Sequence, residues 1–408
     1  MVLKQGTPMT TAIPEPDSAA GLSGVLSAHG RLRQRLATDD PIESSTQIRF
    51  PLGGGQPDPD SFPMRRLAGS ARRVLESDPG ALLYGAGQGY LPLREVVCRK
   101  TGRLEDLALD PEQVLITNGA AQALGLLATA LIDPGDTVLI DEVSWGAGFF
   151  KGFGADLRPV RWDERGPLPQ DIEDACRGRR VKAFYTIPTF QNPLGVTASV
   201  ERRRQVLELA DRHGFLIAED DAYYELRFAG ERVPSLFELA GGNRVVRTGT
   251  FSKILGAGTR LGWAMADRET TALLAAHKYD LGASPFTSRI VADFMQRHMF
   301  AHIRRLQGVY CSKRDALLSV LESELADLPV IWSRPEGGFF CWLQLPSGCS
   351  GVEVERAVAE RGVDVWAGSW FRSDGRDDNC LRIAFSFATL DQIREGAEIF
   401  CRELRRLI

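Results

Sequence analysis

One glycine-rich stretch of the chain combines residue types that suit both a phosphate ester and an aldehyde. In "RTGTFSKILGAGTRLGWAMA", Thr250, Ser252 and Lys253 follow the end of an apolar run, and Arg260 comes seven residues after the lysine. Hydroxyl groups and a guanidinium bind phosphate oxygens, while a lysine amine can form a covalent bond with an aldehyde carbon. A solvated surface loop is the alternative interpretation of this stretch taken alone.

Polar side chains also follow two other apolar runs at the point where each run ends. The stretch "FLIAEDDAYYEL" places Asp220 at the end of a buried run, with Tyr223 three residues later. A carboxylate there can hold a protonated ring nitrogen, and an acidic helix-capping turn is the alternative for "EDD" in isolation. In "FYTIPTFQNPLG", Pro188 and Pro193 fix the backbone on either side of Asn192, so its amide has a defined direction. What Asn192 binds stays open from this stretch alone.

Two further stretches offer a backbone site for an anion and a flat aromatic surface. In "VLITNGAAQALGLLATAL", Gly119, Ala120 and Ala121 stand where a strand passes into a helix. Small residues leave the first backbone N–H groups of a helix open to a phosphate, and the helix dipole favours an anion there. Trp145, in "DEVSWGAGFF", follows the next apolar run and presents a face on which an aromatic ring can stack.

Short apolar runs that alternate with helical patterns must position these residues. The runs cover residues 114–117, 137–141, 181–187, 215–220, 244–250 and 261–266. Strands that are apolar on both faces and separated by helices predict a largely parallel, helix-covered sheet, so the fold class is α/β. Such sheets bind ligands at the carboxyl ends of their strands, where Asp220 and Asn192 lie. One intervening helix is predicted to begin near Ser199 and to end at Gly214.

The C-terminal part of the chain has a different pattern and predicts a second, smaller α+β domain. A helical region over about residues 287–326 precedes strands that follow one another at closer intervals. A last helix is predicted from one apolar stripe, formed by Leu390, Ile393, Ala397, Phe400, Leu404 and Leu407. We predict a partly flexible N-terminal extension over 1–45, a segment over 46–75 that joins the small domain, a large domain over 76–295 and the small domain over 296–408.

Composition and charge restrict the partners and the compartment. The 408 residues are 44% hydrophobic and 25% charged, which is typical of a globular protein with a sizeable core. The net charge of -4 predicts no nucleic-acid partner, and no run of about 18 apolar residues predicts a membrane span. The seven cysteines form no C-x-x-C pair and the first residues lack a signal-peptide pattern, so we expect reduced thiols and a cytoplasmic location.

Taken together, the five stretches resemble, in order and in spacing, the fold type I, class I/II aminotransferases that depend on pyridoxal 5′-phosphate. The resemblance is strongest to the branch that acts on aminoadipate- and kynurenine-like amino acids, with its typical "QNPTG", "EDDPY" and "SFSK...R" motifs, and it covers roughly residues 50 to 408. It implies that the cofactor binds the large domain. It also implies transamination of an α-amino acid through internal and external aldimines and a quinonoid intermediate.

The resemblance also implies a role for each residue that matches a family motif. Lys253 would be the Schiff-base lysine that moves the proton between the substrate Cα and the cofactor, and Asp220 would pair with the pyridine nitrogen. Asn192 and Tyr223 would hold the ring oxygen, and Trp145 would stack on the ring, where the branch usually has tyrosine. The phosphate ligands would be Ala120, Ala121, Thr250, Ser252 and Arg260.

Two further matches concern the substrate and the partner subunit. Arg382, in "CLRIAFSF", corresponds to the arginine that binds the substrate α-carboxylate near Asn192, and a bidentate pair explains why this residue is not a lysine. A surface arginine on a strand is the alternative. Tyr84, in "LLYGAGQGYLPLRE", corresponds to the tyrosine that reaches the phosphate of the neighbouring subunit, which implies a homodimer with shared active sites.

Departures from the family motifs cluster around the predicted site and leave the reaction type open. They are Val143, Leu194, Ala222, Gly256, Ala257, Ala367 and Trp370. None removes a cofactor contact, but Leu194 and Trp370 are expected to reshape the substrate pocket. The alternative to transamination is therefore a pyridoxal-phosphate enzyme of specialised biosynthesis that catalyses β- or γ-elimination, cyclisation or carbon–carbon bond formation.

Two other classes of function receive little support from the sequence. Some transcription regulators carry this fold behind a DNA-binding module, but the first 45 residues contain no convincing helix-turn-helix. His298 and His302 are four residues apart on a predicted helix, and no acidic or cysteine partner is placed beside them, so we expect a solvated helix face and no metal site.

Overall fold

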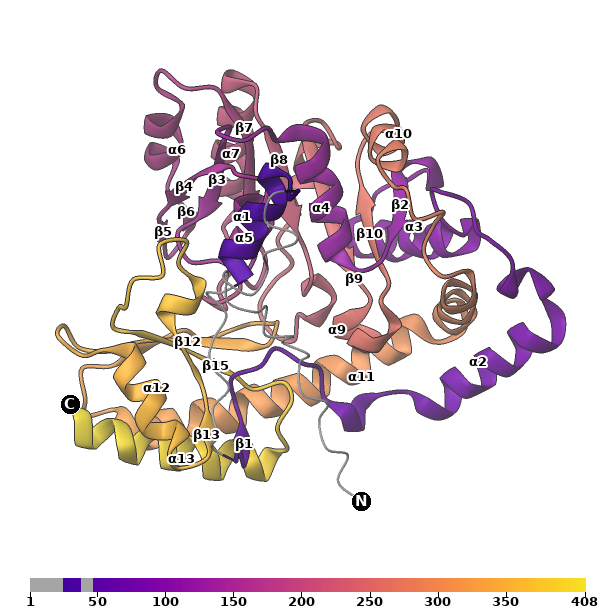
Figure 1. Ribbon diagram of the computed structural model, residues 1–408. Coiled ribbons are helices and arrows are strands. Elements are labelled where there is room, and N and C mark those ends of the chain that lie inside the picture. Colours follow the sequence, from indigo (N-terminus) through magenta and orange to yellow (C-terminus); the bar gives the residue numbers. More distant parts are fainter. Residues whose placement is uncertain (1–24, 38–46) are drawn as a thin grey trace.

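The computed structural model describes residues 25–37 and 47–408. Within the first range, α1 (Ala28–Ala37) is the one helix, and the rest of the predicted extension over 1–45 lies outside the described residues. Two sheets dominate the remainder of the chain, and the long helix α11 (Pro285–Leu325) passes along both of the regions that they form (Figure 1). No helix in the described part of the chain is long and apolar enough to cross a membrane.

The larger sheet has seven strands in the order β2-β10-β9-β8-β7-β3-β4. All neighbouring pairs are parallel except those of β10, which runs antiparallel to both β2 and β9. The predicted α/β class and mostly parallel sheet are therefore confirmed. The strands are β2 (Val114–Thr117), β3 (Thr137–Asp141), β4 (Asp156–Val160), β7 (Val181–Thr186), β8 (Leu216–Asp220), β9 (Val245–Thr250) and β10 (Gly262–Met265).

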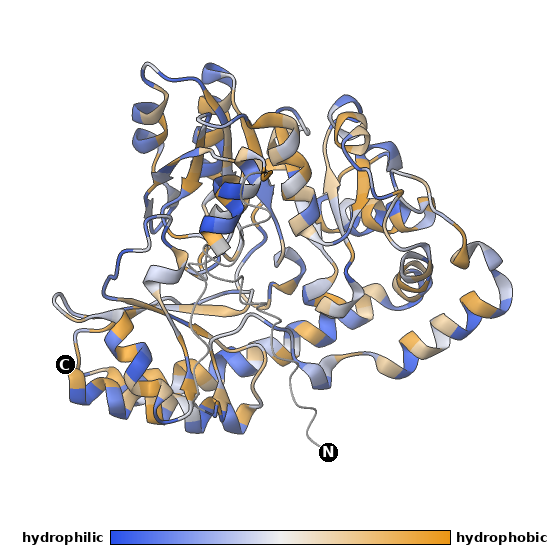
Figure 2. Ribbon diagram, in the orientation of Figure 1, coloured by the Kyte–Doolittle hydropathy of each residue, from blue (hydrophilic) through white to orange (hydrophobic). Residues whose placement is uncertain are grey.

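Helices cover both faces of this sheet, and successive strand residues point into two separate cores. Leu139 belongs to one core, whereas its neighbours Val138 and Ile140 belong to the other, as the pleat of a strand requires. Figure 2 shows the hydrophobic residues gathered on these strands. The covering helices are α3 (Leu91–Glu105), α4 (Ala120–Leu131), α6 (Pro169–Cys176), α7 (Val200–His213), α8 (Leu236–Ala240) and α10 (Arg268–Ala276).

The local signals at the ends of α7 act as the sequence predicts. The Ser199 hydroxyl accepts a hydrogen bond from the Arg202 backbone N–H at 3.2 Å, which caps the first turn. Gly214 ends the helix with φ of +75°, a left-handed conformation that favours glycine. These two caps define the ends of the helix that follows β7 and precedes β8 in the chain.

The smaller sheet is antiparallel, with strands in the order β11-β12-β15-β14. It is formed by β11 (Ile331–Trp332), β12 (Phe340–Gln344), β14 (Trp366–Ala367) and β15 (Cys380–Ala384), with α12 (Gly351–Ala359) and α13 (Leu390–Leu407) beside it. The N-terminal strand β1 (Phe50–Pro51) pairs with β13 (Val363–Asp364), so an N-terminal segment joins the C-terminal part as expected. Helix α11 is continuous through residue 295, and the exact domain limits stay a prediction.

Candidate active site

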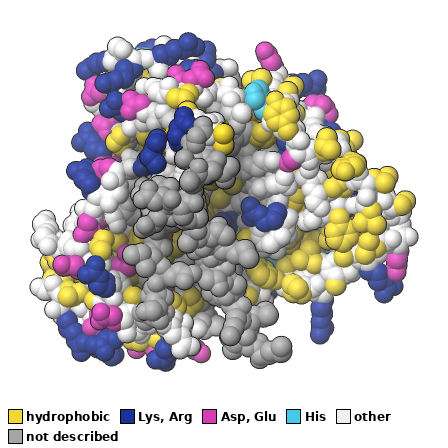
Figure 3. Space-filling model, viewed as in Figure 1, with side chains coloured by type: hydrophobic (Ala, Val, Ile, Leu, Met, Phe, Trp, Pro, Cys, Tyr) yellow, Lys and Arg dark blue, Asp and Glu magenta, His cyan; other side chains and the backbone are white. Residues whose placement is uncertain are grey.

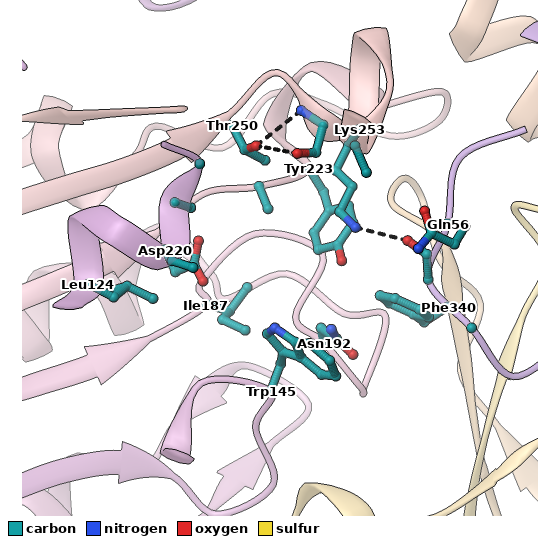
Figure 4. Close-up of a pocket in the computed structure, with 18 of the residues that line it drawn as sticks. Gln56, Leu124, Trp145, Ile187, Asn192, Asp220, Tyr223, Thr250, Lys253 and Phe340 are labelled. Atoms are coloured by element: carbon teal, nitrogen blue, oxygen red, sulfur yellow. Dashed lines mark hydrogen bonds between the residues drawn. The ribbon is translucent and has the colours of Figure 1, made fainter. Parts of the chain in front are cut away.

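A cavity of about 370 Å³ lies where the carboxyl ends of β7, β8 and β9 face the smaller sheet (Figure 4). Its volume suits a small organic ligand. The cavity is lined by every predicted site residue except Tyr84, namely Ala120, Ala121, Trp145, Asn192, Asp220, Tyr223, Thr250, Ser252, Lys253, Arg260 and Arg382. The smaller sheet contributes Phe340, Trp366 and Arg382, and the chain after β1 contributes residues 54–56.

Lys253 projects into this cavity from α9 (Ser252–Leu255), which directly follows β9. Its Nζ donates a hydrogen bond to the Gly55 carbonyl at 2.8 Å. Burial, aided by the positive charge of Arg382, lowers the pKa of this amine to about 8, while Asp220 opposes the shift. A larger fraction of the amine is therefore neutral near neutral pH, which makes it a better nucleophile toward an aldehyde.

Asp220 ends β8 and its buried carboxylate faces the same cavity. Its hydrogen-bond donors in the described structure are two hydroxyl groups, those of Tyr185 at 2.8 Å and of Thr248 at 3.4 Å. Burial raises the pKa of Asp220 to about 6, against the opposing effect of these two hydrogen bonds. A cationic group entering the cavity would supply the charge that favours the ionised form of this carboxylate.

Arg382, Asn192 and Tyr223 form one hydrogen-bonded group that lines the same cavity. The Arg382 Nη1 donates to the Asn192 Oδ1 at 2.8 Å, and the Tyr223 hydroxyl hydrogen-bonds with the Asn192 side chain. The Arg382 Nη2 donates to the Gly53 carbonyl at 2.6 Å, but its buried Nε has no partner in the described structure. Because a buried unpaired donor is costly, this guanidinium suits an anionic ligand such as a carboxylate.

The first turn of α4 and the turn after β9 form a cradle for an anion. Helix α4 begins after Gly119, which has φ of +78° and, being glycine, offers no side chain to cap the first N–H groups of the helix. A Cβ atom on Gly262 would lie 2.5 Å from the Gly119 carbonyl carbon, so glycine is needed for this close approach. The Thr250 hydroxyl donates to the Ser252 hydroxyl at 2.8 Å, and the Arg260 guanidinium lies beside Gly119. The cradle thus combines backbone donors, hydroxyls and one cation.

The loop that carries Asn192 is held in place by two buried polar side chains, those of Asp141 and Gln191. Asp141, at the end of β3, accepts hydrogen bonds from the Ile187 backbone N–H at 3.0 Å and from the Gln191 side chain at 3.4 Å. The Gln191 amide also donates to the Val143 carbonyl at 2.7 Å and accepts from the Leu194 N–H at 2.9 Å. These contacts explain the glutamine beside Asn192, because it ties the loop to β3.

Comparison with known proteins decides the family. Residues 48–400 match the family described as "Aminotransferase class I and II". The chain is 34% identical to an aromatic-amino-acid aminotransferase of Thermococcus litoralis over 90% of both chains. It is 35% identical to a 2-aminoadipate transaminase of Thermus thermophilus over 88% of this chain and 90% of the relative. The chain belongs to the class I and II aminotransferases. These enzymes depend on pyridoxal phosphate, so this chain is a pyridoxal-phosphate-dependent aminotransferase.

A solved structure of the family has the same architecture. The α-aminoadipate aminotransferase of Thermus thermophilus, complexed with N-(5′-phosphopyridoxyl)-L-leucine, superposes with a TM-score of 0.82 at 33% identity. The match covers 88% of this chain and 92% of that chain. The cavity of the present aminotransferase fits the same kind of cofactor by its own chemistry: a cradle for the phosphate, a buried carboxylate for the ring nitrogen and an amine for the aldehyde.

Several residues of this aminotransferase site were not predicted from the sequence. They are Asp141 and Gln191, which hold the loop of Asn192, Tyr185, which contacts Asp220, and Phe340 and Trp366 from the smaller sheet. Asp141 carries a signal that could have been used, because it ends a predicted strand as Asp220 does. Tyr185, Phe340 and Trp366 carry none, because their roles depend on which strands become neighbours.

Of the residues that depart from the family motifs, some line the cavity and others lie outside its lining. Neither Leu194 nor Trp370 lines the cavity, and the Trp370 Nε1 donates to the Glu355 carboxylate at 3.1 Å. Trp370 packs against Trp366, which lines the cavity, with ring centroids 6.3 Å apart, so the expected effect of Leu194 and Trp370 on the substrate pocket stays a prediction. Ala222 and Ala257 do line it. Both are small, so they leave room inside the cavity.

Tyr84 lies outside the cavity lining, and the residue is 89% exposed. It belongs to an apolar surface formed by Leu82, Leu83, Tyr84, Leu281 and Phe286. Figure 3 shows hydrophobic side chains gathered on this edge of the molecule. The predicted contact of Tyr84 with a phosphate in the neighbouring subunit needs a second chain and stays a prediction.

Of the two histidines of α11, His302 hydrogen-bonds with the protein backbone. The buried His302 donates its Nε2 hydrogen to the Ile254 carbonyl at 2.6 Å, which explains a histidine inside this helix. Within residues 25–37 and 47–408, no three His, Cys, Asp or Glu side chains are placed to hold a metal ion. His302 therefore has a structural partner, contrary to the expected solvated face.

Proposed function

We propose that this aminotransferase binds pyridoxal 5′-phosphate in the cavity between its sheets, with Lys253 as the covalent anchor. The observation that carries the proposal is the convergence in one cavity of a low-pKa amine, a buried carboxylate whose hydrogen-bond donors in the described structure are hydroxyls, and a helix N-terminus. When bound, the cofactor supplies an electron-withdrawing ring that stabilises negative charge at the substrate Cα. Asp220 would hold the ring nitrogen in its protonated form.

The phosphate and ring oxygen would be held by groups that already face the cavity. The N–H groups of Ala120 and Ala121 and the side chains of Thr250, Ser252 and Arg260 are proposed as phosphate ligands. Asn192 and Tyr223, which hydrogen-bond with each other, are proposed to hold the ring oxygen. Trp145 lines the cavity with 54% of its side chain exposed, and this free face is proposed to stack on the ring.

The substrate is proposed to be an α-amino acid whose carboxylate pairs with Arg382. The Arg382 side chain lines the cavity, its Nη1 is bonded to Asn192, and its Nε has no partner in the described structure. With the carboxylate held there, the amine of Lys253 is proposed to remove the proton from the substrate Cα. The lowered pKa of Lys253 keeps its amine available as a base.

The side chain of the substrate is proposed to be aromatic or otherwise large and apolar. Trp145 and Trp366 lie nearly parallel, with ring centroids 6.4 Å apart, and Phe149, Ile187 and Phe340 also line the cavity. Such a lining favours apolar groups through burial of their surface. One relative at 34% identity is named an aromatic-amino-acid aminotransferase, in agreement with this proposal, and another is a 2-aminoadipate transaminase.

A homodimer is proposed as the working assembly, with Tyr84 reaching the phosphate in the partner subunit. The apolar surface around Tyr84 supports it, because monomeric proteins rarely expose so many large apolar side chains in one patch.

A cytoplasmic location is proposed on the chemistry of the cysteines. All seven are free in the structure, in keeping with a reducing compartment.

Absorption spectroscopy of the purified protein with its cofactor tests this function. An aromatic amino acid is expected to convert the visible absorption band to the ultraviolet band of the amino form, and a 2-oxo acid should restore it. If no amino acid in a broad panel of apolar, acidic and basic side chains changed the spectrum, the proposed activity would be wrong. A response to acidic amino acids alone would overturn the proposed side-chain preference and leave the activity standing.

A further inference from the structure

Tyr185 makes a direct contact with the predicted cofactor machinery that no matched motif assigns. It lies on β7, its side chain is fully buried, and its hydroxyl donates a hydrogen bond to the Asp220 Oδ2 at 2.8 Å. Tyr185 pairs with Ala218 in the register of β7 and β8. Asp220 comes two residues after Ala218, so its side chain lies on the same face of the sheet as Tyr185. The parallel register therefore brings the phenol to the carboxylate.

The surroundings of Tyr185 leave its ring little freedom. The ring packs against Phe150 with centroids 5.7 Å apart, and both belong to the core on that face of the sheet. A Cβ atom on Gly146 would lie 2.1 Å from the Tyr185 Cζ and 2.2 Å from its hydroxyl oxygen. The residue after Trp145 must therefore be glycine if the phenol is to keep its place. This contact links the loop of Trp145 to Asp220 through one aromatic ring.

The surroundings of Tyr185 keep its hydroxyl protonated, so it acts as a hydrogen-bond donor to Asp220. Burial and the neighbouring Asp220 raise the pKa of the phenol well above its ordinary value, so it stays protonated. Its hydrogen bond favours the ionised form of Asp220 and opposes the effect of burial on that carboxylate. The other donor to Asp220, the Thr248 hydroxyl, is farther away at 3.4 Å from Oδ1. The stronger bond thus fixes Oδ2 and leaves Oδ1 only weakly engaged.

We propose that Tyr185 is a positioning residue that keeps Asp220 ionised and orients it toward the ring nitrogen of the cofactor. The proposal rests on the proposed binding of pyridoxal phosphate in this cavity. In this proposal Tyr185 does not contact the cofactor itself, and it acts through Asp220. The effect on the reaction is electronic, because a protonated ring nitrogen withdraws more charge from the substrate Cα than a neutral one.

The variant Tyr185→Phe removes the donor while keeping the ring. One buried oxygen of Asp220 then loses its partner, the pKa of Asp220 rises, and the ring nitrogen is less protonated. Hydrogen bonds to charged groups are strong enough that we expect cofactor affinity to fall by about ten- to a hundredfold. Thr248→Val removes the longer bond and should cost less. Tyr310→Phe is the control, because it removes a buried phenol oxygen that accepts from the Asp58 N–H, outside the cavity.

Two measurements on the full-length protein test the proposal. The first is the dissociation constant of the cofactor from the apo form, and the second is the ¹⁵N chemical shift of bound cofactor labelled at its ring nitrogen. The shift reports protonation of the nitrogen, which a purely structural role of Tyr185 would not change. We expect Tyr185→Phe to move the shift toward the neutral value and Tyr310→Phe to leave it in place. If Tyr185→Phe kept the wild-type shift, the proposal would be overturned.

The outcomes separate this proposal from the function on which it rests. A wild-type protein that bound no cofactor would refute the proposed function itself. A wild-type protein with a protonated ring nitrogen that Tyr185→Phe leaves unchanged would refute only the role of Tyr185. If Tyr185→Phe did not fold, Gly146→Ala would serve instead, because its methyl group must displace the phenol. Its chemical shift should then move in the same direction, and an unchanged shift would count against the proposal.

Discussion

At the scale of single residues, Arg382 gives the sharpest prediction about the substrate. Its guanidinium is buried among Phe340, Trp366 and Phe371, within 4.3 to 4.5 Å of their ring centroids. A lysine cannot reproduce the planar, two-point contact with a carboxylate or the stacking on these rings. Arg382→Lys should lower kcat/KM for the amino acid by about 10- to 100-fold, mainly through KM. Steady-state kinetics decide this, and an unchanged KM would exclude Arg382 as the carboxylate ligand.

A second residue-scale prediction concerns the pH dependence of stability. The pKa of Lys253 is about 8 in the folded protein, below its ordinary 10.5, so the unfolded chain binds more protons between these values. The contribution of this group to stability therefore rises with pH across that window. The apo form of Lys253→Met should be more stable than wild type near neutral pH, and the difference should shrink toward pH 10. Urea unfolding at several pH values measures it, and a constant difference would contradict the lowered pKa.

Site residues at the ends of strands could be predicted from the sequence, whereas contacts that depend on strand pairing could not. Lys253, Asp220 and Asn192 stand where apolar strands end, and that position is visible in the sequence. The contact of Tyr185 with Asp220 depends on the register between β7 and β8, and that of Arg382 with Asn192 joins residues 190 positions apart. No local pattern records such pairings. The roles taken from the family resemblance therefore reached Arg382, whereas Tyr185 became visible only in the structure.

At the scale of elements, the loop after β7 should be sensitive to its buried supports. Gln191 joins Val143, Leu194 and Asp141 through its side chain. Gln191→Leu leaves these groups unpaired and should cost about 1 to 3 kcal/mol in the free energy of unfolding. It should also raise KM, because Asn192 loses its fixed position beside Arg382. Ser199→Ala is the matched control, since losing the α7 cap should cost about 1 kcal/mol and leave KM unchanged.

The elements themselves were predictable where burial dominates. The runs at 114–117 and 137–141 match β2 and β3 to the residue, and the stripe from Leu390 to Leu407 matches α13. The strand β4 was missed because it is a half-buried edge strand with an arginine and a proline. The antiparallel direction of β10 could not be foreseen, since a short apolar run has the same pattern in either direction.

At the scale of the whole molecule, the apolar surface around Tyr84 should hold two chains together. Replacing Leu83 and Leu281, which are 68% and 62% exposed, with glutamate should produce a monomer. The monomer should lose most of its activity, because Tyr84 could no longer reach the phosphate of a partner. Analytical ultracentrifugation gives the assembly state, and Ile331→Glu on β11, equally exposed at 68%, is the control. A double variant that stayed dimeric would place the interface elsewhere.

The two sheets of the molecule are proposed to meet around a cofactor that is anchored to Lys253. Borohydride reduction of the protein with pyridoxal phosphate, followed by proteolysis and mass spectrometry of the peptides, tests this most directly. We expect one modified lysine, Lys253, and no such modification once the protein has been treated with an amino acid substrate. Modification of a different lysine, or of none, would show that Lys253 does not anchor the cofactor.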